Sequence, residues 1–285
     1  SWAYYLSNSL PGSNGFDGIS IDADDVRLDL NGFALNGIPG SFNGIIVTGP
    51  PRHNITIRNG VVRGWGGCGV AAANANESLI ENITAFTNLA DGLVIGGNSV
   101  IRNCGAFKNV GNGLVVGTAG TVTDCKMRDN GLDGIRADLG CKISDCTAGR
   151  NGQAGISVSN YCTIRDCTVV ENIGIGASGI RMMSQCRVVG NNCGNNSFAG
   201  IEVLGSNNRI EDNSVANNQM GIFVQDSGHG NLVVRNSATG NANMDYRASL
   251  PSNGGDYFGR IVSTNEMTNG GVGFTNTNPW SNFRF

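Results

Sequence analysis

Two arginines and a glutamate are the side chains in this sequence best placed to do chemistry together. Arg136, Arg181 and Glu202 each follow a glycine and an isoleucine. A guanidinium group binds a carboxylate through two parallel hydrogen bonds, and Glu202 could transfer a proton or ligate a cation. Two interpretations stay open: a site for an acidic ligand, or a solvated cross-strand pair of Arg181 with Glu202 worth under about 1 kcal/mol.

Four further residues are candidates for the same surface, namely Asp138, Phe223, Asp226 and His229. Asp138 and Phe223 are predicted on the outward faces of their strands, where the phenyl ring could stack on a sugar. Asp226 and His229 belong to an irregular stretch of the sequence. The aspartate could approach Glu202. The histidine could serve as a base, although a lone loop histidine is more often only solvated.

A repeat of 21 residues positions these side chains. Its last element is an asparagine, which recurs at Asn88, Asn109, Asn130, Asn151 and Asn172. A fixed period of about 20 to 30 residues, with alternating apolar runs and no helical spacing, predicts a β-solenoid. Each repeat would be one coil of three short strands, and we expect about ten coils. The asparagine column is assigned a structural role, because stacked asparagines hydrogen-bond from one coil to the next.

The regular repeat occupies residues 18–241, and we expect a cap on either side of it. Residues 1–17 begin with an alternating strand pattern that would cover the open N-terminal end, since an uncovered end exposes backbone edges. Residues 242–285 are rich in aromatic side chains and would close the other end. The loop at 173–178 is three residues longer than its counterparts, and insertions of this kind often flank a binding surface.

Composition restricts the function classes. The formal net charge of −3 gives no general attraction for nucleic acid, and no apolar run reaches the about 18 residues of a membrane-spanning helix. We therefore expect neither nucleic acid nor a membrane as a partner. The chain begins at Ser1 without methionine, as a trimmed secreted protein or any truncated piece would.

Most of the nine cysteines share coil positions and none forms a CxxC pair. One set is Cys104, Cys125, Cys146 and Cys167, and the other is Cys141, Cys162 and Cys186. In-register stacking does not guarantee disulfide geometry, and the spacing does not fit a zinc site. The pattern predicts two ladders of buried, reduced thiols that behave as small hydrophobic residues.

The repeated Gly-Ile-x-Val strand, the Ile-x-Asn/Asp strand and the turn asparagine cover residues 18–241. On this motif the chain resembles the right-handed parallel β-helix proteins of the pectin-lyase-like superfamily. The resemblance implies an all-β, single-stranded right-handed parallel β-helix. The superfamily includes polysaccharide lyases, glycoside hydrolases, uronate epimerases, phage tailspikes and non-catalytic surface proteins. In its enzymes the substrate usually lies across one sheet, for which we take the glycine-led sheet.

Two signatures of the superfamily are missing from the sequence. One is the Asp-Pro-His of alginate epimerases, and the other is the dense aspartate cluster that holds calcium in pectate-lyase relatives. A Ca²⁺ cofactor therefore stays an open question without a clear site. Glycoside hydrolysis is disfavoured because it needs two carboxyl groups about 5 to 9 Å apart, whereas Asp138 and Glu202 would lie roughly 15 Å or more apart.

Two functional hypotheses follow. The first is a secreted carbohydrate-active enzyme, a lyase that cleaves a uronate-containing polysaccharide by β-elimination. Arg136 and Arg181 would neutralise the substrate carboxylate, and Arg181, Glu202 or His229 would act as the base. The second is a non-catalytic module that binds glycans or forms a rigid surface element. In either case we expect a monomer outside the cell with a polysaccharide as its partner.

Overall fold

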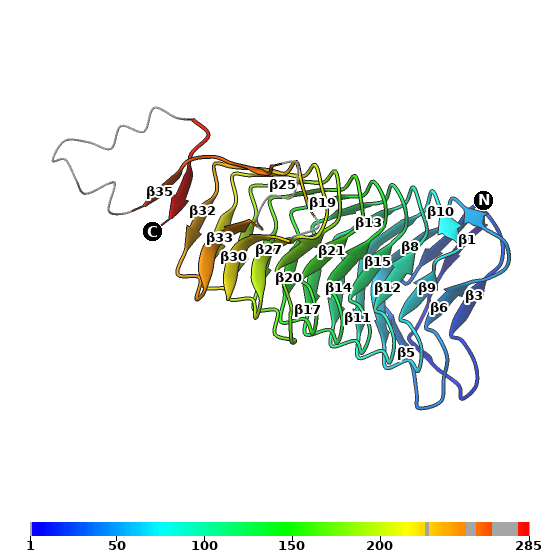
Figure 1. The fold of residues 1–285 in the computed structure, drawn as a ribbon. Coiled ribbons are helices and arrows are strands. Elements are labelled where there is room, and N and C mark those ends of the chain that lie inside the picture. The colour runs from blue at the N-terminus through cyan, green and yellow to red at the C-terminus, as the bar shows by residue number, and fades with distance from the viewer. Residues whose placement is uncertain (1, 226–227, 249–254, 264–278, 285) are drawn as a thin grey trace.

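The computed structural model describes residues 2–225, 228–248, 255–263 and 279–284. In these ranges every regular element is a strand, and all strand pairs are parallel. The chain winds into a right-handed parallel β-helix whose coils stack from the N-terminal to the C-terminal end (Figure 1). The predicted fold class is confirmed.

Two large sheets form the walls. Sheet B contains the glycine-led strands, which are β3 (Ile19–Ile21), β6 (Ile45–Val47), β9 (Val70–Ala72), β12 (Leu93–Ile95), β15 (Leu114–Val116), β18 (Ile135–Ala137), β21 (Ile156–Val158), β24 (Ile180–Met182), β27 (Ala199–Val203), β30 (Met220–Val224) and β33 (Met244–Ala248). These eleven strands include β33, which lies in the stretch that the sequence assigned to the C-terminal cap.

Sheet A contains 23 strands in two columns. The first column holds β1 (Trp2–Tyr5), β4 (Val26–Asp29), β8 (Thr56–Arg63), β11 (Leu79–Phe86), β13 (Val100–Arg102), β16 (Thr121–Thr123), β19 (Lys142–Ser144), β22 (Thr163–Arg165), β25 (Arg187–Val189), β28 (Arg209–Glu211), β31 (Leu232–Val234) and β34 (Tyr257–Phe258). The second column shares β8 and β11 and adds β2 (Leu10–Pro11), β5 (Ala34–Asn36), β14 (Gly105–Phe107), β17 (Lys126–Arg128), β20 (Thr147–Gly149), β23 (Thr168–Val170), β26 (Asn192–Gly194), β29 (Ser214–Ala216), β32 (Ser237–Thr239), β35 (Ile261–Ser263) and β36 (Asn282–Arg284). A separate pair joins β7 (Arg52–His53) and β10 (Ala75–Asn76).

The core is built from identical coil positions. Ile80, Ile101 and Val122 lie in register on neighbouring strands and are fully buried. Strand alternation sends the residues between them outward. A glycine leads the regular strands of sheet B because another backbone approaches closely there: a Cβ added at Gly113 would lie 2.6 Å from the carbonyl oxygen of Gly134 and 2.8 Å from Nδ2 of Asn130.

Three corners per coil turn the chain, and each uses the left-handed backbone region. Non-glycine residues at these corners have φ between 51° and 62°, a conformation that asparagine and aspartate tolerate best. In the central and later coils, most corner residues are followed by a buried asparagine or cysteine side chain that bonds to the adjacent coil. Asn130 shows the pattern, because its Nδ2 donates to Oδ1 of Asn151 at 3.0 Å and its own Oδ1 accepts from Asn109 at 3.0 Å. The structural role of the asparagine column is supported.

The cysteine ladders occupy the other two corners. The seven cysteines of the two ladders are buried, and no cysteine in the described residues is in a disulfide. Both ladders continue as asparagine toward the C-terminal end, where Asn191 accepts the N–H of Cys167 at 3.0 Å and Asn208 accepts that of Cys186 at 2.7 Å. Cysteine and asparagine therefore occupy the same buried corner position in different coils.

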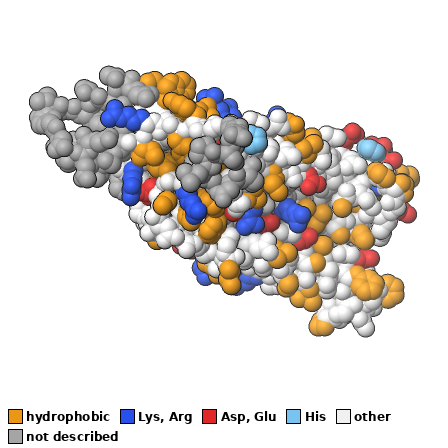
Figure 2. Space-filling model, viewed as in Figure 1, with side chains coloured by type: hydrophobic (Ala, Val, Ile, Leu, Met, Phe, Trp, Pro, Cys, Tyr) orange, Lys and Arg blue, Asp and Glu red, His pale blue; other side chains and the backbone are white. Residues whose placement is uncertain are grey.

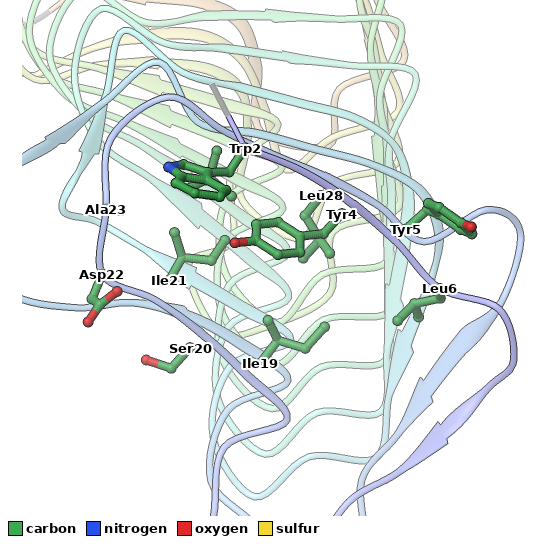
Figure 3. A pocket seen from close by; sticks show the side chains of 11 residues that line it. Trp2, Tyr4, Tyr5, Leu6, Ile19, Ser20, Ile21, Asp22, Ala23 and Leu28 are labelled. Atoms are coloured by element: carbon green, nitrogen blue, oxygen red, sulfur yellow. The ribbon is translucent and has the colours of Figure 1, made fainter.

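The N-terminal residues form two strands of sheet A. The strand β1 pairs with β4 so that Trp2 and Tyr4 stand opposite Val26 and Leu28 and point inward. Above them lies a groove of about 540 Å³ that the first coil leaves open (Figure 3). Trp2 is 67% and Tyr4 54% exposed, because the edge of sheet B at β3 has no strand above it in the described residues.

Candidate functional site

The outward residues of sheet B form one ladder in register. Its rungs are Val94, Val115, Arg136, Ser157, Arg181, Glu202, Phe223 and Arg247. The structure therefore brings four of the predicted site residues onto one face. Neighbouring rungs are about 4.8 Å apart, which places Arg136 and Arg181 on the order of 10 Å from each other.

Glu202 is the most constrained member of this ladder. Its carboxylate accepts hydrogen bonds from Ser178 Oγ at 2.7 Å, Arg181 Nε at 2.9 Å and Gln225 Nε2 at 2.7 Å. The Glu202 side chain is 5% exposed and that of Arg181 is 31% exposed. An acid held by three donors orients its arginine, and it is poorly placed to accept a proton from a bound ligand.

The lengthened loop takes part in the same arrangement. Arg181 Nη2 donates to the carbonyl oxygen of Gly176 at 3.0 Å, and Ser178, at the end of the loop, reaches Glu202. Two of the five N–H groups of Arg181 are thus engaged by the protein, and three N–H groups remain for a ligand. The loop and Glu202 together fix the guanidinium on the ladder.

Asp133 is a candidate site residue that the sequence analysis missed. It precedes β18, is 6% exposed, and accepts the Ala154 N–H at 2.9 Å. Burial raises the pKa of its carboxyl group, while that hydrogen bond and the charges of Arg181 and Arg136 act in the opposite direction. The sequence signal that could have identified Asp133 is its position directly before Gly134, the glycine that leads β18. Asp91 and Asn112 occupy the same position in the two preceding coils and form a hydrogen-bonded column with it.

The remaining predicted residues are placed apart from Arg181. Arg136 and Asp138 are exposed. Phe223 has the guanidinium of Arg247 5.0 Å from its ring centre and the ring of Phe198 edge-on at 5.7 Å, so part of its surface is already covered. Exposed His229 has its Nδ1 3.2 Å from Ser206 Oγ, and Asp226 lies outside the described residues.

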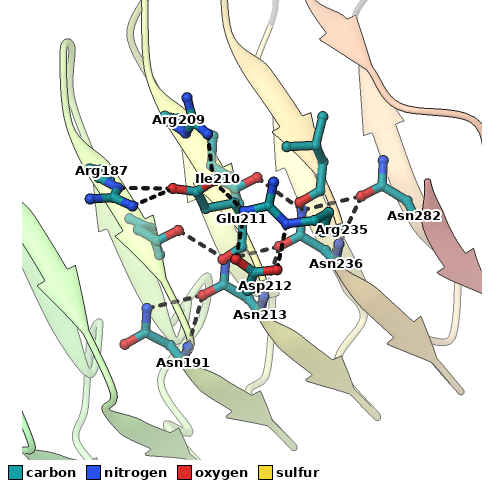
Figure 4. A network of polar contacts seen from close by, with 12 residues as sticks. Arg187, Asn191, Arg209, Ile210, Glu211, Asp212, Asn213, Arg235, Asn236 and Asn282 are labelled. Carbon is teal, nitrogen blue, oxygen red and sulfur yellow. Dashed lines mark hydrogen bonds and ion pairs between the residues drawn. The ribbon is translucent and has the colours of Figure 1, made fainter. Parts of the chain in front are cut away.

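A second charged cluster lies on sheet A (Figure 4). Glu211, whose side chain is 1% exposed, contacts Arg187 at 2.7 Å, Arg209 at 2.8 Å and Arg235 at a similar distance. The pKa of Glu211 is lowered to about 2, and the hydrogen bond from Arg209 is the main cause. Arg187 and Arg235 lower this pKa further, whereas burial of the carboxylate raises it. The three arginines come from three successive coils, so their contacts with Glu211 link neighbouring coils to one another.

Charge is unevenly distributed along the molecule. The first 100 residues contain eight acidic and four basic side chains, whereas the rest contain 14 and 15. Figure 2 shows blue side chains gathered over the middle and later coils. In the described ranges no group of three or more His, Cys, Asp or Glu side chains could hold a metal ion, and no helix there is long and apolar enough to span a membrane.

Known structures share this architecture at low sequence identity. The A-module of mannuronan C-5 epimerase AlgE6 from Azotobacter vinelandii superposes with a TM-score of 0.62 and 16% identity, covering 99% of this chain and 89% of that chain. The Dettilon tailspike protein gives 0.58 and 17%, covering 99% of this chain and 61% of its own. An alginate lyase from Paenibacillus gives 0.52 and 12%, with 80% and 97% covered.

Sequence comparison defines the family. No curated protein matches the sequence. The family model described as "Right handed beta helix region" matches residues 7–135 and 114–269, which together span most of the chain. The protein belongs to the right-handed β-helix family.

Proposed function

We propose that this chain binds an acidic polysaccharide along the outward ladder of sheet B. The observation that carries the proposal is the fixed guanidinium of Arg181, which is held by Glu202 and by Gly176 while it still faces solvent. A donor that is oriented before binding loses less conformational entropy when the ligand arrives. The free N–H groups retain the geometry for a two-point contact to a carboxylate.

The spacing of the ladder fits an extended uronate chain. One coil rises about 4.8 Å, which is close to the length of a sugar unit, so rungs can address successive units. Arg136 and Arg181 would then contact carboxylates two units apart. Two of the similar structures are named a mannuronan C-5 epimerase and an alginate lyase, and their shared fold supports a polysaccharide as the ligand class.

A β-eliminating lyase is the second candidate function. The observation in its favour is Asp133, a nearly buried carboxyl group whose pKa is raised and which lies within electrostatic reach of Arg136 and Arg181. Such a group could carry a proton at a pH where exposed carboxyl groups are ionised, and it could give that proton to the oxygen of the leaving sugar as the glycosidic bond breaks. The base that removes the proton beside the substrate carboxylate would be a different group, and Glu202 is a poor candidate for it because three donors occupy its carboxylate.

The decisive comparison is Arg181→Lys against Arg58→Lys. Arg58 is a matched control, because its Nε also meets a carboxylate, that of Asp29, at 2.9 Å on another face. We expect R181K to weaken binding to polygalacturonate by about tenfold, since lysine keeps the charge and loses the fork, while R58K binds like the wild type. Equal affinities, or binding that does not respond to added salt, would overturn the proposal.

Catalysis is tested in the same samples. A lyase creates an unsaturated sugar end, which absorbs in the ultraviolet. Absorbance that grows with the wild type and disappears with Asp133→Asn would favour the lyase, whereas binding without any new absorbance would favour the binding module. The carboxyl-reduced, neutral polymer serves as the control ligand for both measurements.

A further inference from the structure

A second exposed surface with ligand-binding chemistry lies on sheet A, around Phe107. The ring of Phe107 lies flat along the sheet over Gly105, where an added Cβ would meet its Cε2 at 2.5 Å and its Cζ at 2.8 Å. A side chain at position 105 would push the ring upright. Glycine therefore lets the half-buried ring of Phe107 rest along the sheet as an aromatic platform.

The next rungs add cations and a hollow. Lys126 and Arg128 stand in register with Gly105 and Phe107, and Thr147 and Gly149 follow one coil later. Because Gly149 has no side chain, the outward face is recessed beside Arg128. The resulting cavity measures about 410 Å³ and is lined mainly by Phe107, Lys126, Arg128, Gly149, Arg150 and Val170, within the size range of about 300 to 1,000 Å³ of small-ligand sites.

Among the described residues, some of the charged side chains in this cavity have ion-pair partners and others do not. Asp129 lies 3.5 Å from Arg128 and 3.2 Å from Arg150, so these two arginines share one acid. Lys126 is exposed, and its ammonium group makes no hydrogen bond or ion pair with any residue that the structure describes. Glu171 is the one acidic side chain in the cavity lining. The balance leaves a positive charge beside the ring of Phe107.

We propose that this cavity binds a uronate unit of a glycan, and that it is separate from the ladder on sheet B. The apolar face of the sugar ring would rest on Phe107, and its carboxylate would meet Lys126 and Arg128. The site stands on its own geometry, because none of its residues belongs to sheet B. With binding surfaces on two walls, one molecule could hold two chain segments, which raises avidity without any new contact.

The test uses a tetragalacturonate and its carboxyl-reduced counterpart in calorimetric titrations of the full chain. The variant is Lys126→Gln, and the control is Lys142→Gln, an exposed lysine of β19 in the other column of sheet A. We expect K126Q to weaken one class of sites by about fivefold, the size of an exposed charge contact, while K142Q leaves it unchanged. Phe107→Leu, with its melting temperature measured in parallel, should weaken the same class.

The outcomes distinguish this site from the ladder. If K126Q and F107L weaken binding while R181K leaves that component intact, the second site is established whatever happens on sheet B. If K126Q behaves like K142Q, or if the neutral tetrasaccharide binds as well as the acidic one, the assignment is overturned. Loss of all binding in R181K alone would leave sheet B as the single glycan surface and would also refute the proposal.

Discussion

The sequence predicts the pairing of Arg181 with Glu202, but the structure gives Glu202 a different role from the one expected. The two were expected to face each other across neighbouring strands, and they do so at 2.9 Å. The sequence offered Glu202 as a base or as half of a solvated pair. The structure adds Ser178 and Gln225 as further donors, and it makes the glutamate a nearly buried anchor for the arginine.

At the same scale, Asp133→Asn should stabilise the fold near neutral pH. Burial raises the pKa of this carboxyl above its ordinary value of 3.8, so the aspartate contributes most at low pH and its contribution is lost as the pH rises through the folded-state pKa. Asparagine avoids that loss, and Asn112 shows that an amide fits one coil earlier in the column. We expect Asp133→Asn to have a larger free energy of unfolding than the wild type in urea at pH 7, and the difference to vanish near pH 3.

Glu211 should produce the opposite pH dependence. Its pKa falls from an ordinary 4.5 to about 2, chiefly through Arg209. Its stabilising contribution is therefore complete above about pH 4.5 and is lost as the pH falls toward 2, with a size of about 1 to 3 kcal/mol. Glu211→Gln should be less stable than the wild type at pH 7, and the difference should shrink as the pH falls from about 4.5 toward 2. A constant difference across that range would contradict the assignment.

At the scale of elements, the corner ladders could be predicted better than the functional surface. The repeat of one residue type at one coil position shows the asparagine and cysteine columns directly. The Glu211 cluster was missed because it lies on sheet A, away from the glycine-led strands on which a substrate is expected, although Arg187 and Arg209 share a coil position beside it. Arg247 was missed because β33 follows the point where the repeat fades.

Side-chain partners could not be predicted in the same way. The register of the outward residues of sheet B follows from the period. The hydrogen bonds from Arg181 to Gly176 and from Ser178 to Glu202 depend instead on the path of the 173–178 loop, which has no repeat to align it. The orientation of Phe107 depends on the absence of a Cβ at Gly105. Such contacts are set by local space rather than by periodicity.

The structural role of the asparagine column can be tested with Asn130→Ala. This change removes the acceptor of the Asn109 amide and the donors to Ala106 and Asn151, which leaves buried polar groups without partners. We expect a loss of roughly 1 to 3 kcal/mol in the free energy of unfolding. The control is Asn192→Ala on the outward face of β26, which should change stability by less than about 0.5 kcal/mol. Similar values for both variants would remove the structural assignment.

At the scale of the whole molecule, the solenoid has two unlike ends. In the described part of the C-terminal end, Asn282 completes an asparagine ladder and the Tyr246 hydroxyl donates to the carbonyl oxygens of Asn236 and Phe283. At the N-terminal end, the inward rings of Trp2 and Tyr4 face an open groove (Figure 3). Each coil of a solenoid is stabilised by its neighbours, so a coil with a neighbour on one side should open more readily.

Hydrogen exchange provides a matched comparison between these environments. The Ile19 N–H donates to Gly44 at 3.0 Å and the Leu114 N–H donates to Gly134 at 3.0 Å, so the two amides have the same bond in an end coil and in a central coil. We expect Ile19 to exchange at least about tenfold faster after correction for intrinsic rates, which corresponds to an opening free energy about 1.4 kcal/mol lower. Equal protection would mean that the end is covered in solution. Dilution then shows whether a second copy of the chain is the cover, because a second copy would dissociate from the open groove on dilution. In that case protection at Ile19 would fall while protection at Leu114 stayed constant.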